Sequence, residues 1–89
     1  MFRFVLTDCD KAVRRALLGH GCQTSNQLTA YIARVYKETY SPGTISASLR
    51  KLTLEEVGAY SENEKGQKVY WLTEYGIRSV AEAISKGEI

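Results

Sequence analysis

Residues that commonly bind metals are scarce in this chain of 89 residues. It has two cysteines, Cys9 and Cys22, and one histidine, His20. The two thiols are too few and too widely spaced for a structural zinc site, and the single histidine does not complete one. We therefore expect no metal and no cofactor. In a reducing cytosol both cysteines would be free and at least partly buried, although the sequence leaves a disulfide between them open.

Patterns typical of active sites are missing as well. The chain offers no nucleophile beside a plausible base, no pair of carboxylates at a recognisable catalytic spacing and no glycine-rich loop that could hold a phosphate. His20 stands between two glycines, where a surface turn is a simpler interpretation than a general base. We expect no enzymatic activity and no catalytic residues.

Long apolar runs and a large excess of either charge are also absent. No stretch approaches the roughly 18 apolar residues that cross a bilayer, and no basic segment precedes an apolar run with a cleavage site. These absences predict a cytoplasmic protein without membrane contact. The net charge is only +2, from twelve Lys and Arg against ten Asp and Glu. Composition therefore does not by itself indicate nucleic-acid binding, and the placement of the charges decides.

Local patterns predict a single small domain over residues 1–89. Apolar side chains alternate over residues 1–7, which fits a short strand or an extended arm. The spacing of apolar residues then predicts a helix over 8–19, which opens with a capping-box pattern at Thr7. We expect Arg14 and its neighbour in the chain, Arg15, on the exposed side of this helix.

A second helix is predicted over residues 24–37. Thr24 and Gln27 have the spacing of a capping box, which satisfies the first free amides of a helix. The apolar residues that follow have helical periodicity, so one stripe of the helix should be buried. The members of this stripe are Leu28, Tyr31, Ile32, Val35 and Tyr36.

A third helix is predicted over residues 41–55, directly after a short turn. The Ser41 hydroxyl can cap the helix, and Pro42 lies where its missing N–H costs nothing. One narrow stripe of the helix is apolar, while the remaining surface is small, hydroxylated and basic. Such a surface suits the major groove of DNA, although a solvated surface helix would look similar. The apolar stripe consists of Ile45, Leu49 and Leu52, and Ser48 lies on its flank.

The last part of the chain predicts a hairpin and a final helix. Residues 57–72 contain two runs rich in Val, Tyr and Trp that are joined by a polar tip over 61–67. Thr73 then caps a helix over 73–86. The apolar residues of this helix either close the core or, together with Ala83, form a dimer interface; they are Tyr75, Ile77, Val80, Ala81 and Ile84.

The order of these elements resembles the winged helix-turn-helix domain of small transcription regulators from bacteria, phages, archaea and their viruses. The segment from Tyr70 to Gly76 is similar to the Tyr-x-Leu-Thr-x-x-Gly signature that leads from the wing into the final helix. The resemblance implies an α+β, mainly α fold with a three-helix core, a β-hairpin wing and a C-terminal helix. It also implies that the helix over 41–55 enters the major groove and that the terminal helix forms a homodimer.

Transferred residue by residue, the resemblance predicts a DNA-binding set in the third helix and the wing. Glu62 and Glu64 flank the tip of the wing, where they would repel phosphates. A contact between the wing and DNA therefore stays open at this point. The predicted DNA contacts are Ser41, Gly43, Thr44, Ser46, Ala47, Arg50, Lys51, Lys65 and Lys68.

The function that these observations favour is sequence-specific binding of double-stranded DNA by a homodimeric transcription regulator. Two alternatives remain, since one fold serves several functions. One is a winged-helix module that binds another protein, which the nearly balanced charge would suit. The other is an accessory protein that binds DNA without sequence preference.

Overall fold

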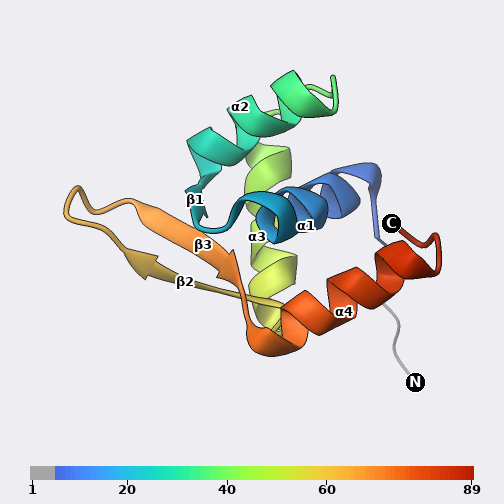
Figure 1. Cartoon of the computed structure of the whole chain (residues 1–89). Coiled ribbons are helices and arrows are strands. Elements are labelled where there is room, and N and C mark those ends of the chain that lie inside the picture. Colours follow the sequence, from blue (N-terminus) through green and yellow to red (C-terminus); the bar gives the residue numbers. More distant parts are fainter. Residues whose placement is uncertain (1–5) are drawn as a thin grey trace.

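Four helices and three strands follow one another along residues 6–89, the part of the chain that the computed structural model describes. Of the arm or strand predicted over residues 1–7, all but Leu6 and Thr7 lies outside the described residues. Figure 1 shows the helices gathered in one body, from which the last two strands project. The elements are α1 (Asp8–His20), β1 (Gln23–Thr24), α2 (Ser25–Val35), α3 (Pro42–Leu54), β2 (Gly58–Glu62), β3 (Lys68–Leu72) and α4 (Glu74–Ser85).

A hydroxyl side chain begins each of these helices. Thr7, Thr24, Ser41 and Thr73 each accept a hydrogen bond from the backbone amide three residues further on. At α1 and α2 the bond is returned by the side chain of the third helical residue, which completes the capping box. The caps define where each helix starts, because they satisfy amides that otherwise lack a partner.

The end of α2 differs from the helix predicted over 24–37. The helix stops at Val35, Tyr36 caps it, and Lys37 has a φ of 58°, in the left-handed region. A residue in that conformation cannot continue a right-handed helix, so the chain turns toward α3 here. Val35 was expected on the buried stripe but is 45% exposed, because it lies on the final turn of α2.

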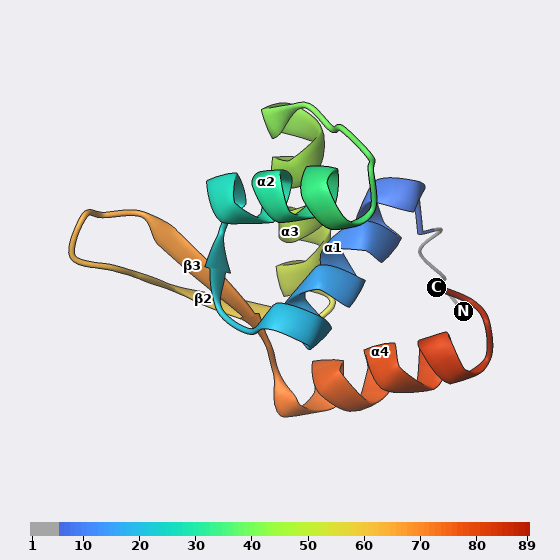
Figure 2. The ribbon, with the colours of Figure 1, turned by 45° about the horizontal axis from the view of Figure 1, so that its top comes forward.

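Three antiparallel strands form the sheet, in the order β1-β3-β2. Gln23 and Thr24, which make up β1, pair with Tyr70 and Val69 of β3. The short strand β1 thereby joins the start of α2 to the hairpin. Beyond this junction the rest of the hairpin extends away from the helices in two views (Figures 1 and 2).

The core lies between α1, α2 and α3 and is closed by α4. Figure 2 shows α4 on the side of α1 that faces away from α2. Val80 is the side chain of α4 that enters the core, with 1% exposure. No helix among residues 6–89 combines the length and apolar character that a membrane span requires. The largest fully buried side chains are Leu28, Ile32, Ile45, Leu49, Leu52, Val13 and Val80.

Two ion pairs join α1 to α3. Lys51 Nζ lies 2.6 Å from Asp10 Oδ2, and Arg14 Nη2 lies 3.1 Å from Glu55 Oε2. The prediction that Arg14 is exposed is therefore wrong: the residue is only 5% exposed. The reason is that Asp10 and Arg14 are one helical turn apart on α1, as are their partners at the end of α3, so both pairs form along one contact between the helices.

The carboxyl group of Asp10 is held in its charged form within this contact. Burial would raise the pKa of Asp10, but hydrogen bonds from Lys51, Ser48 and the Thr7 amide outweigh it. The pKa is consequently lowered from its ordinary value. Asp10 is 2% exposed, so these partners replace the water that the carboxylate loses on folding.

The two cysteines occupy opposite environments, and both are free thiols. Cys9 is buried and its Sγ donates a hydrogen bond to the carbonyl oxygen of Thr44 over 3.8 Å. Burial raises the pKa of the Cys9 thiol. Cys22 is exposed, so the expectation that it is at least partly buried is wrong. It lies in the short segment between α1 and β1.

This difference predicts unequal thiol reactivity. Cys22 is exposed and should react with an aromatic disulfide reagent as fast as a free thiol does. Cys9 should react only when the protein opens, because its thiol is buried and burial disfavours the thiolate, which is the reactive form. One equivalent of thiol is expected for the native protein and two in denaturant. Cys22→Ser should abolish the fast phase. A fast phase that survives this substitution would contradict the burial of Cys9.

Candidate nucleic-acid interface

The outer face of α3 is exposed from its first turn to its middle. Its buried stripe is the one predicted, with Ile45, Leu49 and Leu52 at 1% exposure or less. The exposed side carries small and hydroxylated residues and one arginine, so a partner could approach the helix backbone closely. The exposed members of the predicted set are Ser41, Gly43, Thr44, Ser46, Ala47 and Arg50.

Lys51 and Ser48 face α1 and not this surface. The ammonium of Lys51 bonds to Asp10, and its side chain is 26% exposed. Ser48, expected on the flank of the stripe, is 5% exposed and hydrogen-bonds the same carboxyl group. The structure therefore does not bring Lys51 together with Arg50, its neighbour in the chain, because consecutive helical residues point about 100° apart.

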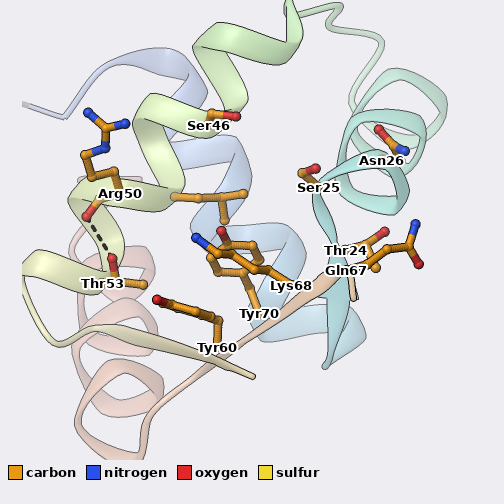
Figure 3. Close-up of a pocket in the computed structure, with 11 residues that line it drawn as sticks. Thr24, Ser25, Asn26, Ser46, Arg50, Thr53, Tyr60, Gln67, Lys68 and Tyr70 are labelled. Atoms are coloured by element: carbon orange, nitrogen blue, oxygen red, sulfur yellow. Dashed lines mark hydrogen bonds between the residues drawn. The ribbon is translucent and has the colours of Figure 1, made fainter. Parts of the chain in front are cut away.

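A cleft with a volume of about 570 Å³ separates α3 from the hairpin. Figure 3 shows α3 on one side, the strands of the hairpin below and the start of α2 opposite. Of residues 6–89, those around the cleft include two cations, Arg50 and Lys68, and no carboxylate. The lining residues are Thr24, Ser25, Asn26, Ser46, Leu49, Arg50, Thr53, Tyr60, Gln67, Lys68 and Tyr70.

Arg50 is the cation on the α3 side of the cleft. The residue is exposed, and no carboxylate within residues 6–89 forms an ion pair with its guanidinium. Its backbone carbonyl accepts a hydrogen bond from the Thr53 hydroxyl over 3.0 Å. The guanidinium itself extends away from the two tyrosines of the hairpin (Figure 3). It is thus available to a ligand that lies along α3.

Lys68 is the cation on the hairpin side. Its Nζ lies 4.7 Å from the centre of the Tyr60 ring, a distance typical of a cation–π contact. Tyr60 in turn faces Tyr70 across the two strands, with 5.5 Å between the ring centres. Tyr60 is 47% exposed. The three side chains form one group in the cleft (Figure 3).

Comparisons with known proteins identify this arrangement. No protein-family model matches the chain, and no curated protein matches it significantly. Among solved structures, RosR of H. salinarum superposes with a TM-score of 0.80 at 22% identity, over 92% of this chain and 74% of RosR. The winged-helix DNA-binding protein of STIV gives a TM-score of 0.78 at 16% identity, over 97% and 92% of the two chains.

A third structure is PadR of Bacillus subtilis in complex with operator DNA. It gives a TM-score of 0.75 at 21% identity, over 84% of this chain and 45% of PadR. The fold is a winged helix-turn-helix. The predicted α+β, mainly α class is confirmed, with α1, α2 and α3 as the three-helix core and β2–β3 as the wing.

The tip of the wing is a turn closed by its own polar groups. The Asn63 side-chain oxygen accepts hydrogen bonds from the amides of Lys65 and Gln67, over 2.9 Å and 3.0 Å. The Asn63 side-chain nitrogen donates to the side chain of Gln67. Gly66, with a φ of 77°, completes the turn. Lys65 is therefore carried on an ordered turn and lies apart from the cleft that contains Lys68.

The predicted set thus divides into four places: the outer face of α3, the cleft, the wing tip and, for Lys51, the contact between α3 and α1. The start of α2 also belongs to the cleft, through Thr24, Ser25 and Asn26. The sequence did not point to these residues, since only the pairing of β1 with β3 brings α2 to the wing. Within residues 6–89 no group of three or more His, Cys, Asp or Glu side chains could hold a metal ion.

Proposed function

We propose that this protein is a cytoplasmic, homodimeric transcription regulator that binds double-stranded DNA in a sequence-specific manner. The observation that carries the proposal is the cleft between α3 and the wing, which contains Arg50 and Lys68 but no carboxylate. The net charge of the chain is only +2, but the described residues that line this cleft include two cations and no acidic side chain. A site that binds the phosphates of DNA requires such an excess of positive charge.

The exposed face of α3 supports a position in the major groove. Gly43 and Ala47 allow a close approach, and the hydroxyls of Thr44 and Ser46 can contact phosphates or base edges. Arg50 can bind the two acceptors of a guanine, the most frequent specific contact in this groove. Regulation would follow from occupation of an operator. The structure of PadR, a protein with the same fold, was solved in complex with operator DNA.

The exposed apolar face of α4 supports a homodimer. Gly76 and Val80 of this helix are buried, but Ile77 and Ile84 are 48% and 40% exposed. No part of residues 6–89 covers these two side chains further, so a second copy of α4 is the partner that we propose. Two recognition helices in such a dimer would read half-sites about one helical turn of DNA apart.

Selection from a random-sequence duplex library, at two salt concentrations, tests the proposal. An enriched palindrome with half-sites about 10 base pairs apart is expected. Retention without enrichment, lost steeply as salt rises, would indicate an accessory protein without sequence preference. If no duplex is retained even at low salt, the proposal is wrong and a protein partner becomes the better hypothesis.

Arg50→Ala should weaken binding to the selected sequence more than binding to unrelated DNA. The bidentate contact to a guanine discriminates by about 1–3 kcal/mol, so specific affinity should fall roughly 5- to 150-fold. Fluorescence anisotropy with the two duplexes measures the difference. Arg15→Ala, which removes an exposed arginine of α1, is the matched control. Equal losses on both duplexes would make Arg50 a phosphate contact and not a reader of bases.

A further inference from the structure

We infer that the wing binds DNA through the face of its strands that borders the cleft, where Lys68 lies over Tyr60, and not through the turn at its tip. The inference rests on the proposed function and names the part of the wing that contacts the phosphates. A contact between the wing and a phosphate could lie at either of two places, the turn at the end of the hairpin or the strands beside the recognition helix. In this chain the lysines at these two places have different charged neighbours.

Lys65 lies on the turn at the tip among carboxylates. Glu64 precedes it in the chain, and Glu62 and Glu64 border the same hollow as Lys65. All three residues are exposed. Asn63 and Gln67, the polar residues that could otherwise contact DNA there, bond to each other and to the turn. At the tip a phosphate would therefore meet two carboxylates beside the ammonium of Lys65, and the side-chain amide of Asn63 is already engaged.

Lys68, the first residue of β3, borders the cleft instead. Glu62 faces it across the strands in register, but its ammonium lies over the ring of Tyr60, two pairs closer to the helices. An aromatic ring holds an ammonium in place without neutralising it. The ammonium therefore keeps its full charge in the cleft, where Arg50 carries the only other charged side chain among the lining residues that the structure describes. A duplex that lies along α3 would meet Arg50 on the α3 side of the cleft and Lys68 on the hairpin side.

Tyr60 acts in this arrangement as a positioning residue. Its ring is fixed from the other side by Tyr70, at 5.5 Å between centres, and Tyr70 packs against the core. The order from core to ligand is therefore Tyr70, Tyr60, Lys68. Because the contact to Lys68 needs only the ring, phenylalanine should replace Tyr60 without loss, whereas an aliphatic residue should not.

The experiment compares Lys68→Ala with Lys65→Ala, which removes the same side chain from the tip of the same hairpin. Affinity for a mixed-sequence duplex is measured over a range of salt concentrations, since phosphate contacts do not depend on sequence. Loss of one phosphate contact lowers the slope of log affinity against log salt by about 0.9, which weakens binding about fivefold near 0.15 M salt. We expect this change for Lys68→Ala and none for Lys65→Ala.

Tyr60→Phe and Tyr60→Leu provide the second readout. Phenylalanine should retain the affinity and the slope, and leucine should weaken binding severalfold while the thermal unfolding midpoint of the two variants stays similar. A change of slope in Lys65→Ala but not in Lys68→Ala would overturn the inference and leave the proposed function intact. If the wild-type protein does not bind the duplex even at low salt, the proposed function fails, and the inference fails with it.

Discussion

Replacing Gly76 by alanine should leave the protein unfolded or only marginally stable. Gly76 is buried in the first turn of α4, where the helix lies against the residues that precede β2. A Cβ at this position would lie 1.8 Å from the carbonyl oxygen of Val57 and 2.7 Å from its carbonyl carbon. Both atoms belong to the backbone, so no side-chain rotation relieves the overlap.

The carbonyl of Val57 is also fixed by other bonds. It accepts hydrogen bonds from the amide and the hydroxyl of Thr73, over 3.0 Å and 3.2 Å. Moving it away from Gly76 would break the junction at which the wing passes into α4. Overpacking that displaces side chains costs about 1–3 kcal/mol. We expect more than about 3 kcal/mol here, a large part of the roughly 5–15 kcal/mol that stabilise a small domain.

Urea unfolding followed by circular dichroism measures this loss. Gly43→Ala is the matched control, since Gly43 is also in the first turn of a helix and a Cβ there meets nothing within 4 Å. That variant should be more stable than the wild type, by about 0.5 kcal/mol, because alanine loses less backbone entropy. An unfolding midpoint of Gly76→Ala close to that of the wild type would mean that α4 is not packed on Val57 as described.

Gly76 also shows why the local signals of this sequence predict so much of the fold. In the Tyr-x-Leu-Thr-x-x-Gly segment, Leu72 enters the core, Thr73 caps α4, and the glycine admits the backbone of Val57. The need for glycine comes from Val57, far earlier in the chain, and shows in the sequence only through the segment as a whole, whereas the cap depends on residues within a few positions of each other. The same holds for the caps of the other helices and for the apolar stripe of α3, so a linear sequence can reveal them.

The cleft depends instead on contacts that local patterns do not encode. The strand β1 has only two residues, and it is defined by its pairing with β3. Without that pairing, nothing in the sequence brings Asn26 at the start of α2 close to Tyr60 and Lys68 of the wing. Local patterns do not predict the exposure of Tyr60 either, because it depends on which face of the hairpin lies toward α3.

The two neighbouring cations of α3 illustrate the same limit. Arg50 and Lys51 both lie off the apolar stripe, so periodicity treats them alike. The structure separates them, since Arg50 borders the cleft while Lys51 reaches α1. Their partners could not be read from spacing because Asp10 is 41 residues away from Lys51 along the chain. A helical pattern gives the direction of a side chain only relative to its own helix.

Replacing Lys51 by methionine should therefore cost stability and not merely a DNA contact. Methionine keeps most of the length of the side chain but removes the charge that lies 2.6 Å from Asp10. The Asp10 carboxylate would stay buried with only Ser48 and the Thr7 amide as partners. Removing one member of a buried pair costs about 3–5 kcal/mol. Because Lys51 is 26% exposed, we expect roughly 2–3 kcal/mol.

The pH dependence separates this cause from a simple loss of packing. In the wild type the pKa of Asp10 is lowered, so its contribution to stability is fully present above the unfolded pKa of about 3.9 and is lost as the pH falls through the folded value. In Lys51→Met the effect of burial is no longer outweighed, and the pKa of Asp10 should rise above its ordinary value. The variant then regains stability as the pH falls through that raised value.

The free energy of unfolding in urea, compared between pH 7 and about pH 4.5, checks this inversion. The difference between the wild type and Lys51→Met should be largest at pH 7 and should narrow on acidification. Asp10→Asn combined with Lys51→Met is the control, since asparagine keeps an acceptor for the Thr7 amide but carries no charge. The double variant should recover at least half of the loss at pH 7 and show no such pH dependence. A difference that stays constant with pH would instead assign the loss to packing, and the pair would not hold α1 to the recognition helix through its charge.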